Sequence, residues 1–195
     1  MRIIAGTQRG MALACPDTLD TRPITDRVKE SLFDVLANYD LLVGQYVADL
    51  FCGVGSLGLE ALSRGAEFVT FVEQDPKIVA FLEKNIAKAR YESQSRITRA
   101  NAFRVGAPPD ATGRRYDLVF VDPPYAKTRE VGEGSQLARL FDVLREQVVE
   151  KGVVVVRTEK GVVPLEVYGP FRTFDRRDWG TMSVTLLQMR GPGAE

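Results

Sequence analysis

Residues 46–64 read YVADLFCGVGSLGLEALSR, an apolar run that ends in a glycine-rich turn and continues into an amphipathic stretch. The run from Tyr46 to Phe51 has the composition of a buried strand, and Ser56 to Arg64 has the spacing of a helix. The turn between them carries the pattern G-x-G-x-x-G, formed by Gly53, Gly55 and Gly58. In this context glycines let the backbone approach a nucleotide-containing ligand closely. The stretch therefore predicts the first unit of an α/β fold with a ligand at the turn.

The alternation of apolar runs with amphipathic stretches continues downstream. Nearly continuous apolar runs are typical of parallel strands covered on both faces, and no helix separates the last two runs, which indicates an antiparallel hairpin. We expect residues 45–191 to form one domain with a mostly parallel seven-stranded sheet, closed by that hairpin. Five of the six further strands are placed by the pattern, at Phe68–Val72, Tyr116–Val121, Gly152–Val156, Thr173–Phe174 and Thr181–Met189, and the further helices are expected at Asp75–Arg90 and Gln136–Val149.

Residues 1–44 are expected to form an extension that docks on this domain, because they are too few for an independent core. Arg2 to Ala14 are predicted to form a β-hairpin that turns at Arg9-Gly10. Thr25 or Asp26 then caps a helix. Its apolar face is expected to carry Val28, Leu32, Val35, Leu36 and Tyr39.

The composition excludes several classes of chemistry. The chain has 195 residues, 45% hydrophobic and 27% charged, and no histidine, which rules out Ser-His-Asp triads, Cys-His nucleophiles and HExxH zinc sites. Two cysteines, Cys15 and Cys52, make neither a disulfide framework nor a four-ligand zinc site, and we expect no metal. The first residues lack a signal-peptide core, and no apolar run approaches the ~18 residues of a membrane span. We expect a cytoplasmic protein with no membrane partner.

Charge gives little guidance about partners. Lysine plus arginine and aspartate plus glutamate number 26 each, so a nucleic acid would be held by local basic patches. Two segments have a net positive charge, although ordinary solvated surface charge explains them equally well. These are residues 1–15, with Arg2 and Arg9, and residues 170–190, with Arg172, Arg176, Arg177 and Arg190.

Two carboxylates near the glycine-rich turn narrow the choice of ligand. Glu73 follows the next predicted strand, where a carboxylate can accept the ribose hydroxyls of an adenosine. Asp49 would repel a pyrophosphate at the helix N-terminus but would attract an ammonium group. NAD carries a pyrophosphate, whereas S-adenosylmethionine carries an ammonium and a sulfonium. The pattern therefore favours S-adenosylmethionine over a dinucleotide.

The segment Asp122-Pro123-Pro124-Tyr125 follows a predicted strand at the carboxyl edge of the sheet, where open α/β sheets bind ligands. An exocyclic amino group of a base is a poor nucleophile because its lone pair is delocalised into the ring. The Asp122 carboxylate and the Pro123 carbonyl can each accept one of its N–H groups, which favours a pyramidal nitrogen. Neither proline has an N–H to oppose the amino group, and Tyr125 offers a flat face for an extruded base. The segment predicts methyl transfer to an amino nitrogen.

Together these residues resemble the amino-methyltransferases with a DPPY motif. Residues 21–33, TRPITDRVKESLF, are similar to the RPTTDRVRE element of the RsmD-like family, the bacterial methyltransferases that act on N2 of a guanine in 16S rRNA. Residues 49–66 follow that family's DLFAGSGALGLEALSRGA run. The opening Arg-Ile-Ile-Ala-Gly and the late Trp179-Gly180-Thr181 also fit. The resemblance spans nearly the whole chain.

The resemblance implies a Rossmann-like fold and transfer of a methyl group from S-adenosylmethionine to N2 of guanine 966 in 16S rRNA. It also implies that an assembling small ribosomal subunit presents this guanine. We further expect a monomer that acts on a base flipped out of its stack. The catalytic positions would be Asp122, Pro123, Pro124 and Tyr125. The cofactor-binding positions would be Thr25, Asp49, Phe51, Gly53, Gly55, Glu73, Gln74, Asn101 and Ala102.

Two positions depart from the family pattern. Asn101 stands where related enzymes usually have an aspartate for the adenine amino group, and an asparagine oxygen can accept the same hydrogen bond. The family's Tyr-Gly-Asp reads Trp179-Gly180-Thr181 here, which leaves an RNA contact by that segment open.

Four alternatives use parts of the same pattern. A DNA adenine-N6 methyltransferase shares the DPPY chemistry but usually needs extra mass to read a duplex, and a protein glutamine methyltransferase typically starts this motif with asparagine. A non-catalytic ribosome-assembly module that binds RNA would show a damaged motif, and neither motif is damaged. A dinucleotide-dependent oxidoreductase would place Asp49 against a pyrophosphate. Methylation of 16S rRNA is the leading prediction.

Overall fold

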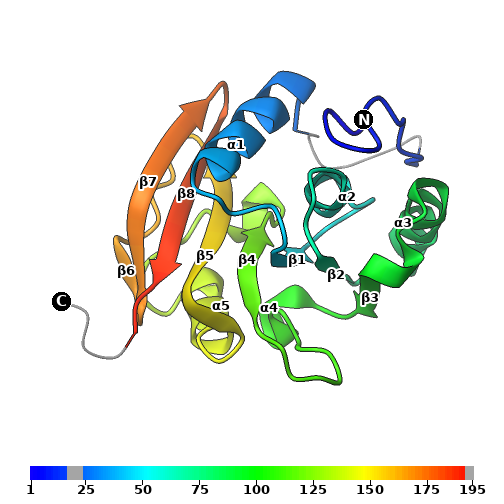
Figure 1. Ribbon diagram of the computed structural model, residues 1–195. Coiled ribbons are helices and arrows are strands. Elements are labelled where there is room, and N and C mark those ends of the chain that lie inside the picture. The colour runs from blue at the N-terminus through cyan, green and yellow to red at the C-terminus, as the bar shows by residue number, and fades with distance from the viewer. Residues whose placement is uncertain (17–23, 192–195) are drawn as a thin grey trace.

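The computed structural model describes residues 1–16 and 24–191, which form helices around an eight-stranded sheet (Figure 1). The strand order is β3-β2-β1-β4-β5-β8-β7-β6, with β1 to β5 parallel and β6 to β8 antiparallel to their neighbours. The predicted class and the antiparallel closure are confirmed, with eight described strands in place of seven. The strands are β1 (Tyr46–Leu50), β2 (Phe68–Glu73), β3 (Ser95–Arg99), β4 (Tyr116–Val121), β5 (Val148–Glu159), β6 (Val167–Tyr168), β7 (Phe171–Trp179) and β8 (Met182–Met189).

Helices cover both faces of the sheet. Side chains of α1, α2 and α3 share one apolar core with Val47 of β1, whereas α4 and α5 share a second core with Ala48 and Leu50. Alternate residues of one strand thus enter different cores, which explains the nearly continuous apolar runs. The helices are α1 (Asp26–Asn38), α2 (Ser56–Ser63), α3 (Pro76–Ala89), α4 (Ala102–Val105) and α5 (Gln136–Leu144), with short 3-10 turns η1 (Glu92–Gln94) and η2 (Tyr125–Lys127).

Three elements differ from the sequence pattern. The helix predicted over 136–149 ends at Leu144, and Val148 begins β5 by pairing with Tyr116, because a neighbouring strand overrides local helical spacing. The pattern also does not predict β3 or β6. β3 reads Ser-Arg-Ile-Thr-Arg at one edge of the sheet, and β6 has two residues at the other edge. Edge strands have only one paired neighbour, so they lack the apolar runs of inner strands.

The N-terminal segment forms a short version of the predicted hairpin. Arg2 and Ala12 make an antiparallel bridge, in which the N–H of Ile3 donates to the Met11 carbonyl and the N–H of Leu13 donates to the Met1 carbonyl, both at 3.0 Å. The pairing does not extend further, because the N–H groups of Ile4 and Ala5 donate to the two carboxylate oxygens of Glu60 at 2.7 and 3.0 Å. The hairpin prediction is therefore confirmed in part, and the segment is held against α2.

The helix α1 begins where the sequence predicts. The Thr25 hydroxyl accepts the N–H of Val28 at 3.4 Å, so Thr25 is the N-cap. The helix ends at Asn38, so Tyr39 is not part of the buried face. Tyr39 is 43% exposed, and its hydroxyl donates to Asp175 at 3.2 Å.

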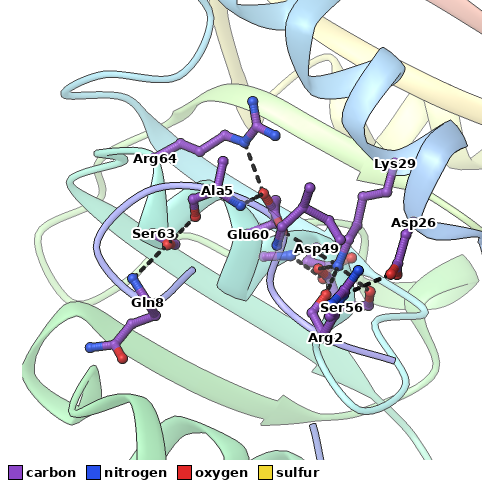
Figure 2. A network of polar contacts seen from close by, with 12 residues as sticks. Arg2, Ala5, Gln8, Asp26, Lys29, Asp49, Ser56, Glu60, Ser63 and Arg64 are labelled. Atoms are coloured by element: carbon purple, nitrogen blue, oxygen red, sulfur yellow. Dashed lines mark hydrogen bonds and ion pairs between the residues drawn. The ribbon is translucent and has the colours of Figure 1, made fainter. Parts of the chain in front are cut away.

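A buried ion pair joins α1, the N-terminal segment and α2 (Figure 2). Nζ of Lys29 lies 3.4 Å from Oε2 of Glu60, and both side chains are almost completely buried. Nζ also donates to the Arg2 carbonyl at 2.6 Å and to the Ser56 hydroxyl at 3.2 Å, while Nε of Arg64 donates to Oε1 of Glu60 at 2.9 Å. Because Ser56 opens α2, this network fixes the helix that follows the glycine-rich turn.

Candidate active site

The glycine-rich turn lies at the carboxyl end of β1, and its glycines have different surroundings. Gly53 has φ 55°, and a Cβ there would meet nothing within 4 Å. Gly55 has φ 89°, and a Cβ there would lie 2.5 Å from Leu82 of α3, whereas a Cβ on Gly58 would overlap the Phe71 ring of β2. Gly55 and Gly58 therefore permit close packing of α2, and Gly53 leaves open space for a ligand.

Glu73, the last residue of β2, is hydrogen-bonded to this turn. Its Oε2 accepts the N–H of Gly53 at 3.1 Å, and its Oε1 accepts the N–H groups of Gln74 and Asp75 at 2.8 and 2.9 Å. A carboxylate has about four acceptor positions, so these bonds hold it in one orientation and leave capacity for a further donor. The structure thus brings the predicted cofactor positions Gly53, Glu73 and Gln74 together.

Asp49 lies in the interior, on the α2 side of the turn. Its side chain is 1% exposed, and its Oδ2 accepts the N–H of Gly58 at 2.8 Å. Burial raises the pKa of Asp49 to about 8; the Gly58 hydrogen bond opposes the rise, and the charges of Asp122 and Glu73 add to it. These contacts give Asp49 a part in shaping the turn, and its attraction for a ligand ammonium stays a prediction.

Phe51 and the segment Asn101–Phe103 bring the ends of β1 and β3 together. The ring centroids of Phe51 and Phe103 are 4.6 Å apart, and Phe51 has φ 58°, a strained value for a residue with a side chain. Oδ1 of Asn101 accepts the N–H of Phe103 at 3.0 Å and caps α4, and Ala102 is buried. No sequence pattern singles out Phe103, because its contact with Phe51 depends on how two distant strands are placed.

Thr25, a predicted cofactor-binding position, is the N-cap of α1. The described residues show no hydrogen bond between Thr25 and the glycine-rich turn; its hydroxyl caps α1.

The segment Asp122–Tyr125 starts beside the glycine-rich turn. The N–H of Asp122 lies 3.5 Å from the carbonyl oxygen of Leu50, the last residue of β1, and β1 and β4 are paired neighbours. Pro123 is buried, Pro124 is exposed, and Tyr125 begins η2. The predicted catalytic segment and the predicted cofactor turn therefore leave adjacent strands at the same edge of the sheet.

Arg157 of β5, which no sequence pattern singles out, contacts this segment. Its Nε lies 2.5 Å from Oδ1 of Asp122, and its guanidinium carbon lies 5.6 Å from the centroid of the Tyr125 ring. The contact is an ion pair between two largely buried side chains. Burial raises the pKa of Asp122, and the Arg157 charge opposes that rise. Arg157 closely follows an apolar run, so only the pairing of β4 with β5 reveals its partner.

The described residues suit a nucleoside cofactor. The open side of Gly53 gives access to backbone, Glu73 offers an oriented carboxylate for hydroxyl groups, and Phe51 with Phe103 forms an aromatic wall. These features fit the adenosine part of S-adenosylmethionine. Within residues 1–16 and 24–191, no group of three cysteine, aspartate or glutamate side chains is arranged to hold a metal ion. No helix in those ranges is long and apolar enough to cross a bilayer.

Comparison with known proteins places the chain in a family. Residues 1–188 match the family model described as "Conserved hypothetical protein 95". A Bacillus subtilis protein named "Putative rRNA methyltransferase YlbH" is 32% identical over 195 residues, which cover 98% of this chain and 100% of that protein. The chain belongs to this family.

Other relatives agree with this family assignment. "Ribosomal RNA small subunit methyltransferase D" of Escherichia coli is 41% identical over 127 residues, covering 65% of this chain and 61% of that protein. The solved structure titled "Putative methyltransferase yhhF from Escherichia coli" is 32% identical with a TM-score of 0.79, and the match covers 97% of this chain and 98% of that one. The RsmD-like resemblance and the Rossmann-like methyltransferase fold predicted from the sequence are confirmed.

Proposed function

We propose that this protein transfers a methyl group from S-adenosylmethionine to the exocyclic N2 of a guanine in 16S rRNA, with guanine 966 as the expected position. The family assignment supports an rRNA substrate, since the relatives from B. subtilis and E. coli carry the names of rRNA methyltransferases. The guanine and its position come from the sequence resemblance.

One observation carries the proposal: the Asp122–Tyr125 segment and the glycine-rich turn start from paired strands, with the Asp122 N–H 3.5 Å from the Leu50 carbonyl. A cofactor held at the turn and a base held at Asp122 would therefore be neighbours. Methyl transfer requires this arrangement, because the nucleophile and the methyl carbon must be close and in line.

Four groups in this segment have complementary tasks. The Asp122 carboxylate and the Pro123 carbonyl accept the two N–H groups of the amino nitrogen and favour its pyramidal form. The Tyr125 ring supports the extruded base by stacking, which contributes ~1–3 kcal/mol per base in other proteins. Pro124 restricts the backbone that presents them. Of these groups, the Asp122 carboxylate can take the proton that the nitrogen loses after transfer.

The cofactor is held by residues at the ends of the neighbouring strands. Gly53 has no side chain, so the cofactor can approach its backbone; Glu73 accepts hydrogen bonds from the ribose hydroxyls, and Phe51 and Asn101 contact the adenine. When bound, S-adenosylmethionine supplies an electrophilic methyl group on a sulfonium. Binding of the cofactor by Gly53, Glu73, Phe51 and Asn101 in this way requires no metal ion.

The test is incubation with methyl-labelled S-adenosylmethionine and, separately, unmodified small ribosomal subunits, naked 16S rRNA, duplex DNA and cell protein. Nucleosides from the digested RNA are then analysed. We expect label in N2-methylguanosine from 16S rRNA, and mapping decides whether position 966 is the target. Label in DNA adenine or in protein would keep the DPPY chemistry and replace the substrate, and label in no acceptor despite cofactor binding would refute the proposed activity.

A further inference from the structure

Arg157 and Asp122 occupy matching positions on neighbouring strands. β4 and β5 pair in parallel, and their last paired residues are Val121 and Val156, so Asp122 and Arg157 each come next along the chain. Their side chains are 18% and 12% exposed, and Nε lies 2.5 Å from Oδ1. The sheet itself therefore sets the contact, which does not depend on a flexible surface side chain.

The guanidinium of Arg157 contacts the DPPY segment. It pairs with Asp122 and lies beside the Tyr125 ring, and its Nη1 is buried with no hydrogen-bond partner within the described residues. The guanidinium of Arg96 also has a buried nitrogen without a partner, Nε, but it donates to the carbonyl oxygens of Pro108 and Pro109. Arg96 therefore ties two segments of the fold together, whereas Arg157 is directed at the candidate site.

The surroundings of Asp122 otherwise oppose a negative charge. The carboxyl group is largely buried, and burial is the main cause that raises its pKa. Asp49, from β1, is a second buried acid that interacts electrostatically with it. From its own segment, Tyr125 brings its ring to 5.6 Å from the guanidinium carbon of Arg157. Arg157 is the cation that lowers the pKa of Asp122.

We propose that Arg157 is a positioning residue of the methyl-transfer site: it keeps Asp122 as a carboxylate with one oxygen fixed, so that the other oxygen can accept the target amino group. A protonated Asp122 would be a weaker acceptor and would present a hydroxyl donor to the N–H groups it must bind. This inference rests on the proposed function, because the amino group is the substrate assigned there.

The test combines a titration that needs no substrate with a rate profile. The carboxyl carbons of aspartate are labelled with ¹³C, and the Asp122 signal, assigned with Asp122→Asn, is titrated by NMR in wild type, Arg157→Met, Arg157→Gln and Arg157→Lys. The rate of methyl transfer to small ribosomal subunits is measured over the same pH range, with cofactor affinity measured by calorimetry. Arg114→Met is the matched control, because Arg114 also pairs with a carboxylate, Glu67, and lies over a tyrosine, Tyr46, away from the active site.

We expect Arg157→Met to raise the titration midpoint of Asp122 by about 1–3 pH units. The pH–rate curve should shift to higher pH by the same amount. Cofactor affinity should stay within about twofold of wild type. Arg157→Lys should restore most of both values, and Arg114→Met should change neither. Arg157→Gln gives the same reading if the methionine variant does not fold.

Two outcomes would overturn the inference. One is an Asp122 midpoint that does not respond to loss of the Arg157 charge. The other is a lysine variant as impaired as the methionine variant at every pH, which would indicate a steric role. An inactive wild type would refute the proposed function, whereas an active wild type with an unmoved midpoint would refute only the role of Arg157.

Discussion

Gly53 donates its backbone N–H to Oε2 of Glu73 at 3.1 Å, so the turn after β1 is hydrogen-bonded to the end of β2. The sequence presents these residues as two separate signals, a glycine motif and an acid after the next strand. In the fold they share one bond. The conformation of the turn and the orientation of the proposed ribose acceptor are therefore coupled, and a change at Glu73 should affect both.

Glu73→Ala is expected to weaken binding of S-adenosylmethionine roughly tenfold or more, because hydrogen bonds to a charged group contribute about 1.5–3 kcal/mol. Calorimetric titration measures the dissociation constant directly. Glu67→Ala serves as the control, since Glu67 is an exposed acid beside Arg114, and its affinity should equal that of wild type. Equal affinities for Glu73→Ala and wild type would remove Glu73 from the cofactor site.

The glycines of the turn should separate into two kinds when each is changed to alanine. Gly58→Ala is expected to lower the free energy of unfolding by about 1–3 kcal/mol, because the added Cβ overlaps the Phe71 ring in a packed core. Gly53→Ala has space for its Cβ but keeps φ 55°, which costs roughly 1–2 kcal/mol and places a methyl group where the cofactor would approach. Urea unfolding and cofactor titration of both variants test this contrast. Strong binding by Gly53→Ala would show that the ligand does not pass that side of the turn.

The features predicted best from sequence are those encoded within a few neighbouring residues. The glycine pattern and the Asp122–Tyr125 segment each follow their own strand closely, and both lie at the predicted edge of the sheet. Parallel strands end at one edge, so local signals after β1 and β4 were sufficient to bring the two together.

The features that the sequence did not reveal depend on contacts between distant segments. Arg157 acquires its partner only through the register of β4 with β5, and the hairpin pairing of the N-terminal segment stops where the N–H groups of Ile4 and Ala5 bond to Glu60. The direction of the Asp49 side chain was also not predictable, because the path of the turn brings the Gly58 N–H to it. The sequence shows the residue type at each of these positions, but the contacts of each side chain depend on the fold.

Lys29→Met is expected to lower the free energy of unfolding by about 3–5 kcal/mol, because it leaves the buried Glu60 carboxylate without one of its cationic partners. Lys84→Met, on the exposed side of α3, should change stability by no more than about 0.5 kcal/mol. Both values come from urea denaturation at one pH. A small effect of Lys29→Met would mean that Arg64 alone compensates Glu60.

The buried acid Asp49 should make the fold less stable as pH rises. Its pKa is raised to about 8 in the folded protein from an ordinary value of 3.8, so the folded state holds a proton that the unfolded state has released. Its contribution to stability is fully present below about pH 4 and is lost as pH rises toward 8, with a slope of up to ~1.4 kcal/mol per pH unit.

Asp49→Asn removes this titration and keeps an oxygen for the Gly58 N–H, so we expect a flatter stability profile between pH 5 and 8 (about the window of the raised pKa). Urea denaturation at several pH values, compared with wild type, measures the difference. Identical slopes for the two proteins would show that Asp49 titrates near its ordinary pKa.

Asp122→Ala is expected to reduce methyl transfer by roughly 100-fold or more, which is the usual cost of removing one hydrogen-bonding group that acts on the reacting centre. Cofactor affinity should stay within about twofold of wild type, because the contacts proposed for the cofactor come from the ends of β1, β2 and β3. Tyr125→Phe keeps the ring face and should retain most of the rate, which makes it the matched variant from the same segment. Single-turnover rates and calorimetric affinities of the two variants decide the assignment. Parallel losses of rate and cofactor affinity in Asp122→Ala would place Asp122 in the cofactor site, and the base would then need another acceptor for its amino group.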